Sequence, residues 1–235
     1  MKKNSNFLIL IPAYNEENNI IEVVELSKKY ADVCVINDSS SDSTLKKLNT
    51  CSNIKIINHK INTHIPGAII DGMKYAYEQN YDYVITMDAG FSHNPNEIPR
   101  FIDYMDCDLL IGIRSIISNK PSVYRILLSK IGNFLYNVSL DFPSSIIFFS
   151  KYKDLTSGFR RFSKKSIKII LEKKIHSKSY DFHLETVFYI YKKKKHIYET
   201  PISYQYTNSS LNNKVVLDCI VLWLKAIFGF IKSKN

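Results

Sequence analysis

Short apolar runs alternate with segments of helical spacing through the first half of the chain. Apolar runs bounded by polar residues predict buried strands, and the segments between them predict helices. Because these strands are apolar throughout, both faces of their sheet should be covered. The predicted strands cover residues 7–11, 32–37, 54–58, 83–87 and 108–113, and the predicted helices cover 16–30, 42–48, 67–78 and 96–105. We therefore predict an α/β fold with an open, mostly parallel twisted sheet and helices on both faces.

The second half of the chain breaks this alternation. Helices are predicted over 123–140, 164–172 and 182–192, and a last strand over 197–206. Between them, the segment 142–150 is an apolar, serine-rich loop whose large side chains should be either covered by protein or in contact with lipid. No repeat or long linker divides the chain, so we expect one domain over residues 1–210.

The remaining segment, 211–235, predicts an apolar or amphipathic C-terminal helix. Its apolar part, 215–231, contains only Asp218 and Lys225 as charged residues. A helix that spans a bilayer needs roughly 20 predominantly apolar residues. We therefore expect this helix to dock on the domain or to lie in a membrane interface, with Trp223 among its anchors.

Composition narrows the class of protein. The net charge of +10 favours an anionic partner, but only five of the 32 basic residues are arginine. The lysines are dispersed and the aromatic residues lie in apolar runs, which argues against nucleic acid as the partner. The four cysteines show no C-x-x-C spacing, so we expect a cytoplasmic protein without disulfides or structural zinc. No G-x-G-x-x-G follows the first strand, which excludes a nicotinamide-dependent dehydrogenase.

A carboxylate ends the fourth predicted strand. Asp88 follows the apolar run 83–87 and precedes small residues and a polar cluster. Open α/β sheets bind ligands and metals at the carboxyl ends of their strands. An isolated aspartate there is more often a cap of a turn or helix, so its interpretation depends on the other strand ends.

Polar clusters follow those other strand ends as well. PAYNE (12–16) follows the first strand and NDSSSD (37–42) the second, where Asp38 can accept hydrogen bonds from a base or a ribose. Arg114 ends the fifth strand, and both it and Arg125 could bind a phosphate through planar guanidinium groups. DLTSGFR (154–160) is a further polar turn. These positions predict one ligand crevice at the carboxyl edge of the sheet.

In combination these motifs resemble the family 2 glycosyltransferases, and within them the polyprenyl- or dolichyl-phosphate sugar (mannose) synthases. The matching segments are PAYNE, NDSSSD, MDAGFSHNP, IGIR and DLTSGFR, in the family's order and spacing. The resemblance implies a GT-A type, Rossmann-like fold and a nucleoside diphosphate sugar as donor. It also implies Mg²⁺ or Mn²⁺ as cofactor, inverting transfer to a polyprenyl phosphate, and peripheral contact with the cytoplasmic face of a membrane.

The resemblance also implies roles for single residues, carried over by position. The residues expected to hold the nucleoside are Pro12, Tyr14, Glu16 and Asp38. The residues expected at the metal and diphosphate are Asp88 and Ser92. The residues expected to bind the acceptor phosphate are Arg114, Arg125 and Ser129. The residues expected to act at the reaction centre are Asp88, Asp154, Arg160 and Glu185.

Three positions depart from the family pattern. Gly90 replaces the second acid of the metal motif, Asn37 replaces the first acid of the second motif, and 207–211 lacks the family's lysine. Because Mg²⁺ needs few protein carboxylates when phosphates and waters complete its shell, we expect Asp88 and the donor diphosphate to suffice, assisted by Ser92 or His93.

Two alternatives to the lipid-phosphate reaction stay open. The acceptor could instead be a glycan hydroxyl in surface polysaccharide synthesis, which would require Asp154 or Glu185 as a general base. The chain could also bind nucleotide sugar without turnover, as the loss of the acid at position 90 suggests.

Overall fold

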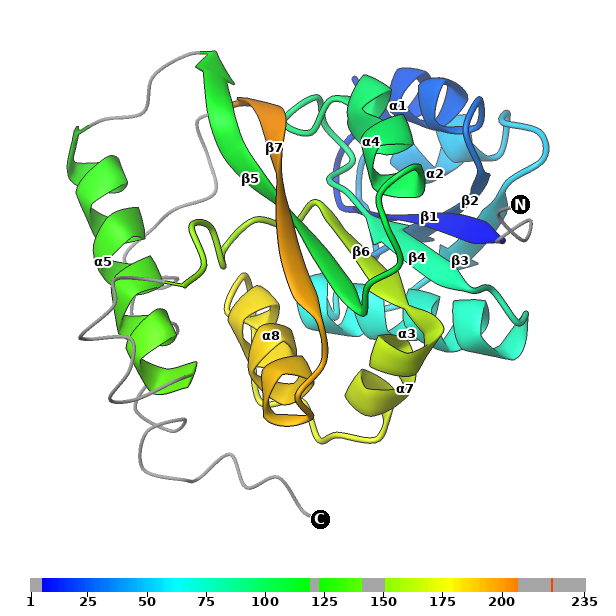
Figure 1. The fold of residues 1–235 in the computed structure, drawn as a ribbon. Coiled ribbons are helices and arrows are strands. Elements are labelled where there is room, and N and C mark those ends of the chain that lie inside the picture. The colour runs from blue at the N-terminus through cyan, green and yellow to red at the C-terminus, as the bar shows by residue number, and fades with distance from the viewer. Residues whose placement is uncertain (1–5, 119–122, 141–150, 207–220, 222–235) are drawn as a thin grey trace.

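The computed structural model describes residues 6–118, 123–140, 151–206 and Val221. Its strands form one sheet in the order β3-β2-β1-β4-β6-β5-β7 (Figure 1). β6 is antiparallel to β4 and β5, and the other neighbouring pairs are parallel. The strands are β1 (Phe7–Ala13), β2 (Asp32–Asn37), β3 (Lys55–Asn58), β4 (Tyr83–Thr86), β5 (Leu109–Ser118), β6 (Arg160–Ser163) and β7 (Ile197–Gln205).

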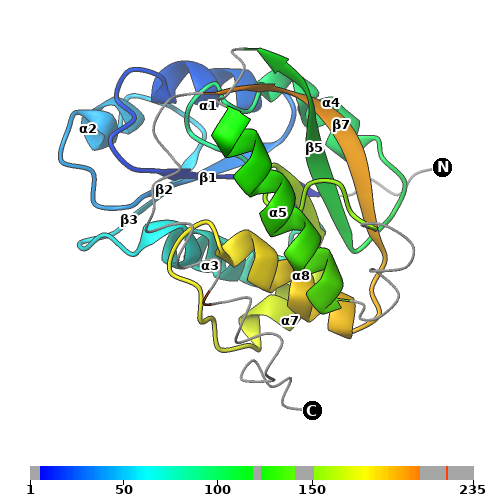
Figure 2. The ribbon, with the colours of Figure 1, turned by 90° about the vertical axis from the view of Figure 1, so that its left-hand side faces the viewer.

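Helices cover both faces of this sheet (Figures 1 and 2). On one face lie α1 (Ile20–Ser27), α2 (Thr44–Leu48), the short 3₁₀ helix η1 (Pro95–Glu97) and α4 (Ile98–Ile102). On the other lie α3 (His64–Glu78), α7 (Lys164–Leu171) and α8 (Phe182–Lys192), with α5 (Val123–Leu140) packed against α8. The predicted α/β fold, an open and mostly parallel sheet with helices on both faces, is confirmed.

The alternation of side chains along β1 explains why the sheet is buried on both sides. Leu8 and Leu10 belong to a core cluster shared with α3, α7 and α8, whereas Ile9 and Ile11 belong to a second cluster shared with α1 and α4. Successive residues of a strand point to opposite faces. The continuous apolar run of β1 therefore contributes side chains to both hydrophobic cores, as the sequence pattern predicted.

The structure differs from the predicted elements at several boundaries and in one strand. The predicted helix over 16–30 starts only at Ile20, because residues 14–19 form a loop with Asn15 at a positive φ. The fifth strand extends to Ser118. The sequence did not predict β6, which inserts antiparallel between β4 and β5. The predicted loop 142–150 and most of the predicted C-terminal helix over 211–235 lie outside the described residues.

Candidate active site

A cleft of about 650 Å³ opens at the carboxyl ends of β1, β2 and β4. Six residues predicted to bind the donor or the metal line it. They are Pro12, Tyr14, Glu16, Asp38, Asp88 and Ser92. The α3 amino terminus, the loop before α8 and Tyr204 of β7 complete the wall. The four predicted residues Arg114, Asp154, Arg160 and Glu185 are not among the residues that line this cleft.

The loops after β1 and β2 are tied to each other. The Asn15 backbone N–H donates to the Ser40 hydroxyl, and the Asn15 side-chain oxygen accepts from the Ser41 N–H. The Glu16 N–H donates to the Thr44 hydroxyl at 2.8 Å. These bonds hold the PAYNE loop in the non-helical conformation that turns Tyr14 and Glu16 toward the cleft.

The Asp38 carboxylate is buried and held in place by three donors. Its Oδ1 accepts from the Thr63 N–H and hydroxyl, each at 2.8 Å, and lies 2.8 Å from His59 Nδ1. On its other side, His59 Nε2 lies 3.3 Å from an Asp71 carboxylate oxygen. This network fixes the orientation of Asp38, so that a ligand in the cleft meets a preorganised carboxylate.

Sequence analysis missed His59 and Thr63. The polar run from Asn58 to His64 directly after β3 was the available signal, because it lies at the same edge of the sheet as the other clusters. Asn37, the departure from the family pattern beside Asp38, donates to the Asn58 side chain at 2.6 Å and does not line the cleft.

The carboxylate of Asp88 is 43% exposed, and its backbone is anchored by His93. The Asp88 N–H donates to His93 Nδ1 at 3.0 Å, so this nitrogen carries no proton. Burial lowers the pKa of His93, and the ring stays neutral at physiological pH. His93 also packs on Phe159 and Tyr204. Its Nδ1 is thus occupied in holding the strand end, and the expectation that His93 assists the metal finds no support.

Glu16 and Gly90 face each other across the cleft floor. A Cβ built on Gly90 would lie 3.6 Å from Glu16 Oε2 and 3.9 Å from the Asn19 side-chain nitrogen. Apart from the two chain neighbours of Gly90, no atom of another described residue would lie closer than these. Asn19 donates its side-chain N–H to Glu16 Oε2 at 3.4 Å. Burial, followed by the charges of Asp88 and Asp42, raises the pKa of Glu16. The Glu16 carboxylate therefore lies beside the position where the second acid of the motif is missing, and the charge of Asp88 acts on it.

Gly158 brings the DLTSGFR turn onto this site. Its carbonyl accepts from the Thr86 hydroxyl at 2.8 Å. A Cβ at position 158 would lie 3.6 Å from Asp88 Oδ1 and only 3.1 Å from Nε2 of His183. Glycine thus permits the close approach of this backbone to the strand end. His183, which the sequence analysis did not assign, is buried, and burial holds its pKa well below the ordinary value.

Arg114 and Asp154 form a bidentate ion pair. Nε and Nη2 of Arg114 each lie 2.7 Å from a carboxylate oxygen of Asp154, and Nη2 also donates to the Thr156 hydroxyl. The ring of Tyr204 lies 5.3 Å from the guanidinium carbon. Burial alone would raise the pKa of Asp154, but the charge and hydrogen bonds of Arg114 outweigh it and lower the pKa.

The buried side chain of Arg160 donates hydrogen bonds to backbone carbonyls and does not line the cleft. It is fully buried, and its guanidinium donates to the carbonyl oxygens of Leu155, Ser157 and His183. Burial lowers the pKa of Arg160 to about 9, so the group remains charged at neutral pH. Arg160 therefore supports the turn at residues 155–158 and does not line the cleft, and its role at the reaction centre stays a prediction.

Glu185 is likewise buried, with 1% of its surface exposed. Its carboxylate accepts from the backbone N–H groups of His176 and Ser177 and from the Tyr189 hydroxyl. These bonds fix the loop that precedes α8. The structure therefore does not place Glu185 where a general base would be needed. The side chains of Arg125 and Ser129 in α5 lie outside the described residues.

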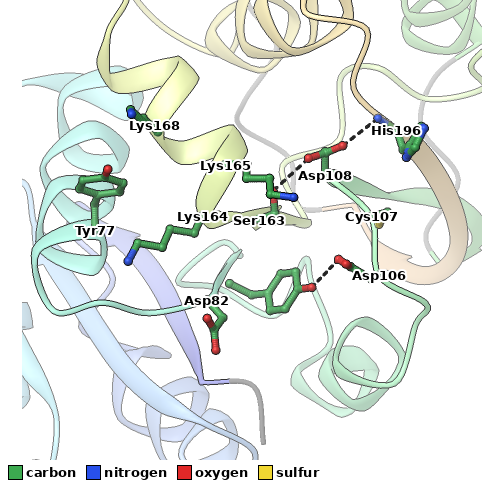
Figure 3. A pocket seen from close by; sticks show the side chains of 11 residues that line it. Tyr77, Asp82, Asp106, Cys107, Asp108, Ser163, Lys164, Lys165, Lys168 and His196 are labelled. Atoms are coloured by element: carbon green, nitrogen blue, oxygen red, sulfur yellow. Dashed lines mark hydrogen bonds between the residues drawn. The ribbon is translucent and has the colours of Figure 1, made fainter. Parts of the chain in front are cut away.

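A second pocket, of about 590 Å³, lies at the opposite edge of the sheet (Figure 3). Three lysines of α7 and three aspartates are among the residues that line it; the lysines are Lys164, Lys165 and Lys168, and the aspartates are Asp82, Asp106 and Asp108. Asp108 accepts from the His196 N–H and Asp106 from the Tyr83 hydroxyl. These acids hold chain segments together, so the pocket adds no candidate residue for the predicted chemistry.

No helix within the described ranges is both long enough and apolar enough to span a membrane. No group of three or more His, Cys, Asp or Glu side chains in the same ranges is arranged to hold a metal ion.

Comparison with known proteins gives concordant matches. The sequence model described as Glycosyl transferase family 2 matches residues 8–168. A relative from Methanococcus voltae, UDP-N-acetylglucosamine–dolichyl-phosphate N-acetylglucosaminyltransferase, is 31% identical over 225 residues, covering 86% of this chain and 87% of its own. Undecaprenyl-phosphate mannosyltransferase from Micrococcus luteus is 25% identical over 228 residues, covering 91% and 90%.

Among solved structures, glucosyl-3-phosphoglycerate synthase from Mycobacterium tuberculosis is similar in fold. Its complex with Mn²⁺, UDP and glucosyl-3-phosphoglycerate aligns with a TM-score of 0.71 over 96% of this chain and 81% of that one. The sequence identity is 11%, so this likeness concerns the fold alone.

Proposed function

Because the chain belongs to glycosyl transferase family 2, and is thus a glycosyltransferase, we propose that it moves a sugar from a nucleoside diphosphate sugar to a polyprenyl phosphate. The anomeric carbon would be attacked by an acceptor phosphate oxygen as its bond to the donor diphosphate breaks, with inversion. Two relatives whose names specify dolichyl-phosphate and undecaprenyl-phosphate reactions support this acceptor class.

The donor's nucleoside is assigned to the loops after β1 and β2. Pro12, Tyr14 and Asp38 line this end of the cleft, and Asp38 is oriented by Thr63 and His59. A fixed carboxylate accepts hydrogen bonds from a ribose hydroxyl or a base N–H without reorganising on binding.

The donor set at Asp88 fits a divalent cation. An exposed carboxylate oxygen and an open position beside Gly90 are the chemistry that Mg²⁺ or Mn²⁺ requires, provided that phosphates and waters supply the other ligands. Such a cation, when bound, supplies positive charge that stabilises the departing diphosphate. Asp88 is the residue proposed to hold it, with Ser92 close by in the cleft.

We choose a phosphate acceptor because both carboxylates predicted as general bases are already hydrogen-bonded to other groups of the protein. Asp154 is bidentate to Arg114 with a lowered pKa, and Glu185 is buried against backbone N–H groups. A sugar hydroxyl would need a general base to remove its proton. A phosphate acceptor is already ionised at neutral pH and needs none, so positioning can account for its reactivity.

The acceptor phosphate is proposed to bind near Arg114, with Arg125 and Ser129 as predicted partners from α5. Arg114 would contribute its charge in addition to ordering the 154–156 turn. Arg125 lies on α5 by its position in the chain.

We further propose that a basic surface, defined as Lys151, Lys192, Lys194 and Lys195 with Tyr191 and Tyr198, contacts anionic lipid. Lys151 lies over the Tyr191 ring at 5.1 Å, which mixes charge with aromatic surface. Each lysine near an anionic bilayer contributes about 1 kcal/mol. Ile131 and Phe134 of the adjacent α5 are each 46% exposed and extend this surface with apolar groups.

Vesicle co-sedimentation tests the membrane contact. Binding to phosphatidylglycerol vesicles should fall by about tenfold or more in Lys192→Glu/Lys194→Glu. The matched variant Lys29→Glu/Lys46→Glu, with exposed lysines on the α1 and α2 side, should bind like the parent. Equal binding by both variants would reject this surface.

A thermal stabilisation screen tests the donor. UDP- and GDP-sugars are compared with and without Mn²⁺, since a ligand raises the melting temperature according to its occupancy. One nucleotide class should stabilise the protein, more strongly with Mn²⁺, and Asp38→Ala should abolish the shift. No stabilisation by any nucleotide sugar would contradict the proposed donor.

A further inference from the structure

The acid missing at position 90 leaves a specific space in the cleft. The Cβ that an aspartate would carry there meets Glu16 Oε2 at 3.6 Å and Glu16 Oε1 at 4.0 Å. An aspartate's carboxylate oxygens lie roughly 2.4 Å beyond its Cβ. Glu16 therefore brings a carboxylate to within about one bond length of the region that an acid at position 90 would reach.

Local contacts hold Glu16 in this position. Its backbone N–H is bonded to the Thr44 hydroxyl, and its Oε2 accepts from the Asn19 side chain at 3.4 Å. Asn19 also lines the cleft, directly before α1. These hydrogen bonds fix both the backbone and the carboxylate of Glu16, so that its side chain is held beside Gly90.

We propose that Glu16 is the second protein carboxylate of the divalent cation site, replacing the acid that Gly90 lacks. This inference rests on the proposed function. Compared with the family pattern, one metal ligand would come from the loop after β1 instead of the loop after β4. Glu16 would then bind the metal instead of the nucleoside. Hard divalent cations accept such carboxylate oxygens from any loop that presents them.

A carboxylate exchange between positions 16 and 90 tests the proposal. Mn²⁺ affinity is measured by electron paramagnetic resonance on the full chain, with Mn²⁺ alone and with Mn²⁺ and UDP. Glu16→Gln should weaken Mn²⁺ binding by about tenfold or more. Glu16→Gln/Gly90→Asp should recover the affinity to within about threefold of the parent. The aspartate fits because the nearest atoms to its Cβ are at ordinary contact distance.

Glu22→Gln is the matched control, since Glu22 is exposed in the first turn of α1 and does not line the cleft. It should leave Mn²⁺ binding unchanged, and circular dichroism confirms that each variant is folded. Unchanged affinity in Glu16→Gln, or no recovery in the double variant, would overturn the role of Glu16 while leaving the proposed function intact. Absence of Mn²⁺ binding by the parent would instead reject the metal site itself.

Discussion

Asp38 and Asp88 illustrate how single residues of the cleft are held in place by neighbours that the sequence pattern does not identify. Asp38 is held by Thr63 and His59, and the Asp88 backbone is held by His93. The sequence analysis found the carboxylates because they follow apolar runs. It missed their partners because a histidine or threonine in a polar loop has no periodicity, and only the fold brings it to the site.

His59→Gln should weaken nucleoside diphosphate binding about five- to tenfold, because Asp38 loses a donor and part of its fixed orientation. Isothermal titration calorimetry with UDP and GDP measures this. His196→Gln is the control, since His196 is exposed at the opposite edge of the sheet. If His59→Gln binds the nucleotide as tightly as the parent, His59 does not position Asp38.

The burial of His183 predicts that the free energy of unfolding decreases at acidic pH. Burial keeps its folded pKa well below the ordinary value, while the unfolded chain takes up a proton near pH 6.5. The unfolded state thus binds more protons as the pH falls below about 6.5, and the free energy of unfolding drops by up to about 1.4 kcal/mol per pH unit. Urea denaturation at pH 7.5, 6.5 and 5.5 (about one unit apart) should show a shallower fall for His183→Gln. Identical slopes in the two proteins would contradict this assignment.

At the scale of elements, β6 is the strand that the pattern of apolar residues did not predict. Its four residues, RRFS, begin with two arginines, yet all are buried. Arg160 satisfies carbonyls of the 155–157 turn, and Arg161 satisfies those of Phe101 and Met105. Two charges in so short a segment argue against a central strand unless tertiary partners are known. The long apolar strands and α5 and α8 needed no such partners, and the sequence predicted them well.

The packing of α3 on β1 depends on Gly72. A Cβ there would lie 2.1 Å from a Leu10 methyl group, so Gly72→Ala should overpack the core and lower the free energy of unfolding by about 1–3 kcal/mol. Gly132→Ala in α5 is the control, because nothing lies within 4 Å of its Cβ position. It should be neutral or stabilise by about 0.5–1 kcal/mol. Denaturant titration compares them, and equal stability of the two variants would refute the close contact.

At the scale of the molecule, the sheet separates two edges with different properties. The carboxyl edge gathers the predicted donor and metal residues into one cleft, whereas the pocket at the opposite edge is lined by lysines and by aspartates that accept hydrogen bonds from neighbouring segments (Figure 3). The sequence predicted a crevice at the carboxyl edge because parallel strands place their carboxyl ends together, but it predicted nothing about the opposite edge. It could not predict that Arg114 pairs with Asp154 or that Glu185 is buried, since both depend on the path of the chain between β5 and β7.

The most direct test is the identity of the glycosylated product. The protein is incubated with Mn²⁺, the nucleotide sugar selected by stabilisation, and either undecaprenyl phosphate, undecaprenol or a short glycan, and the extracts are analysed by mass spectrometry. We expect one sugar to be added to undecaprenyl phosphate and none to undecaprenol, because only the phosphate attacks without a general base. Transfer to the glycan but not to undecaprenyl phosphate, or no transfer to any acceptor, would contradict the account.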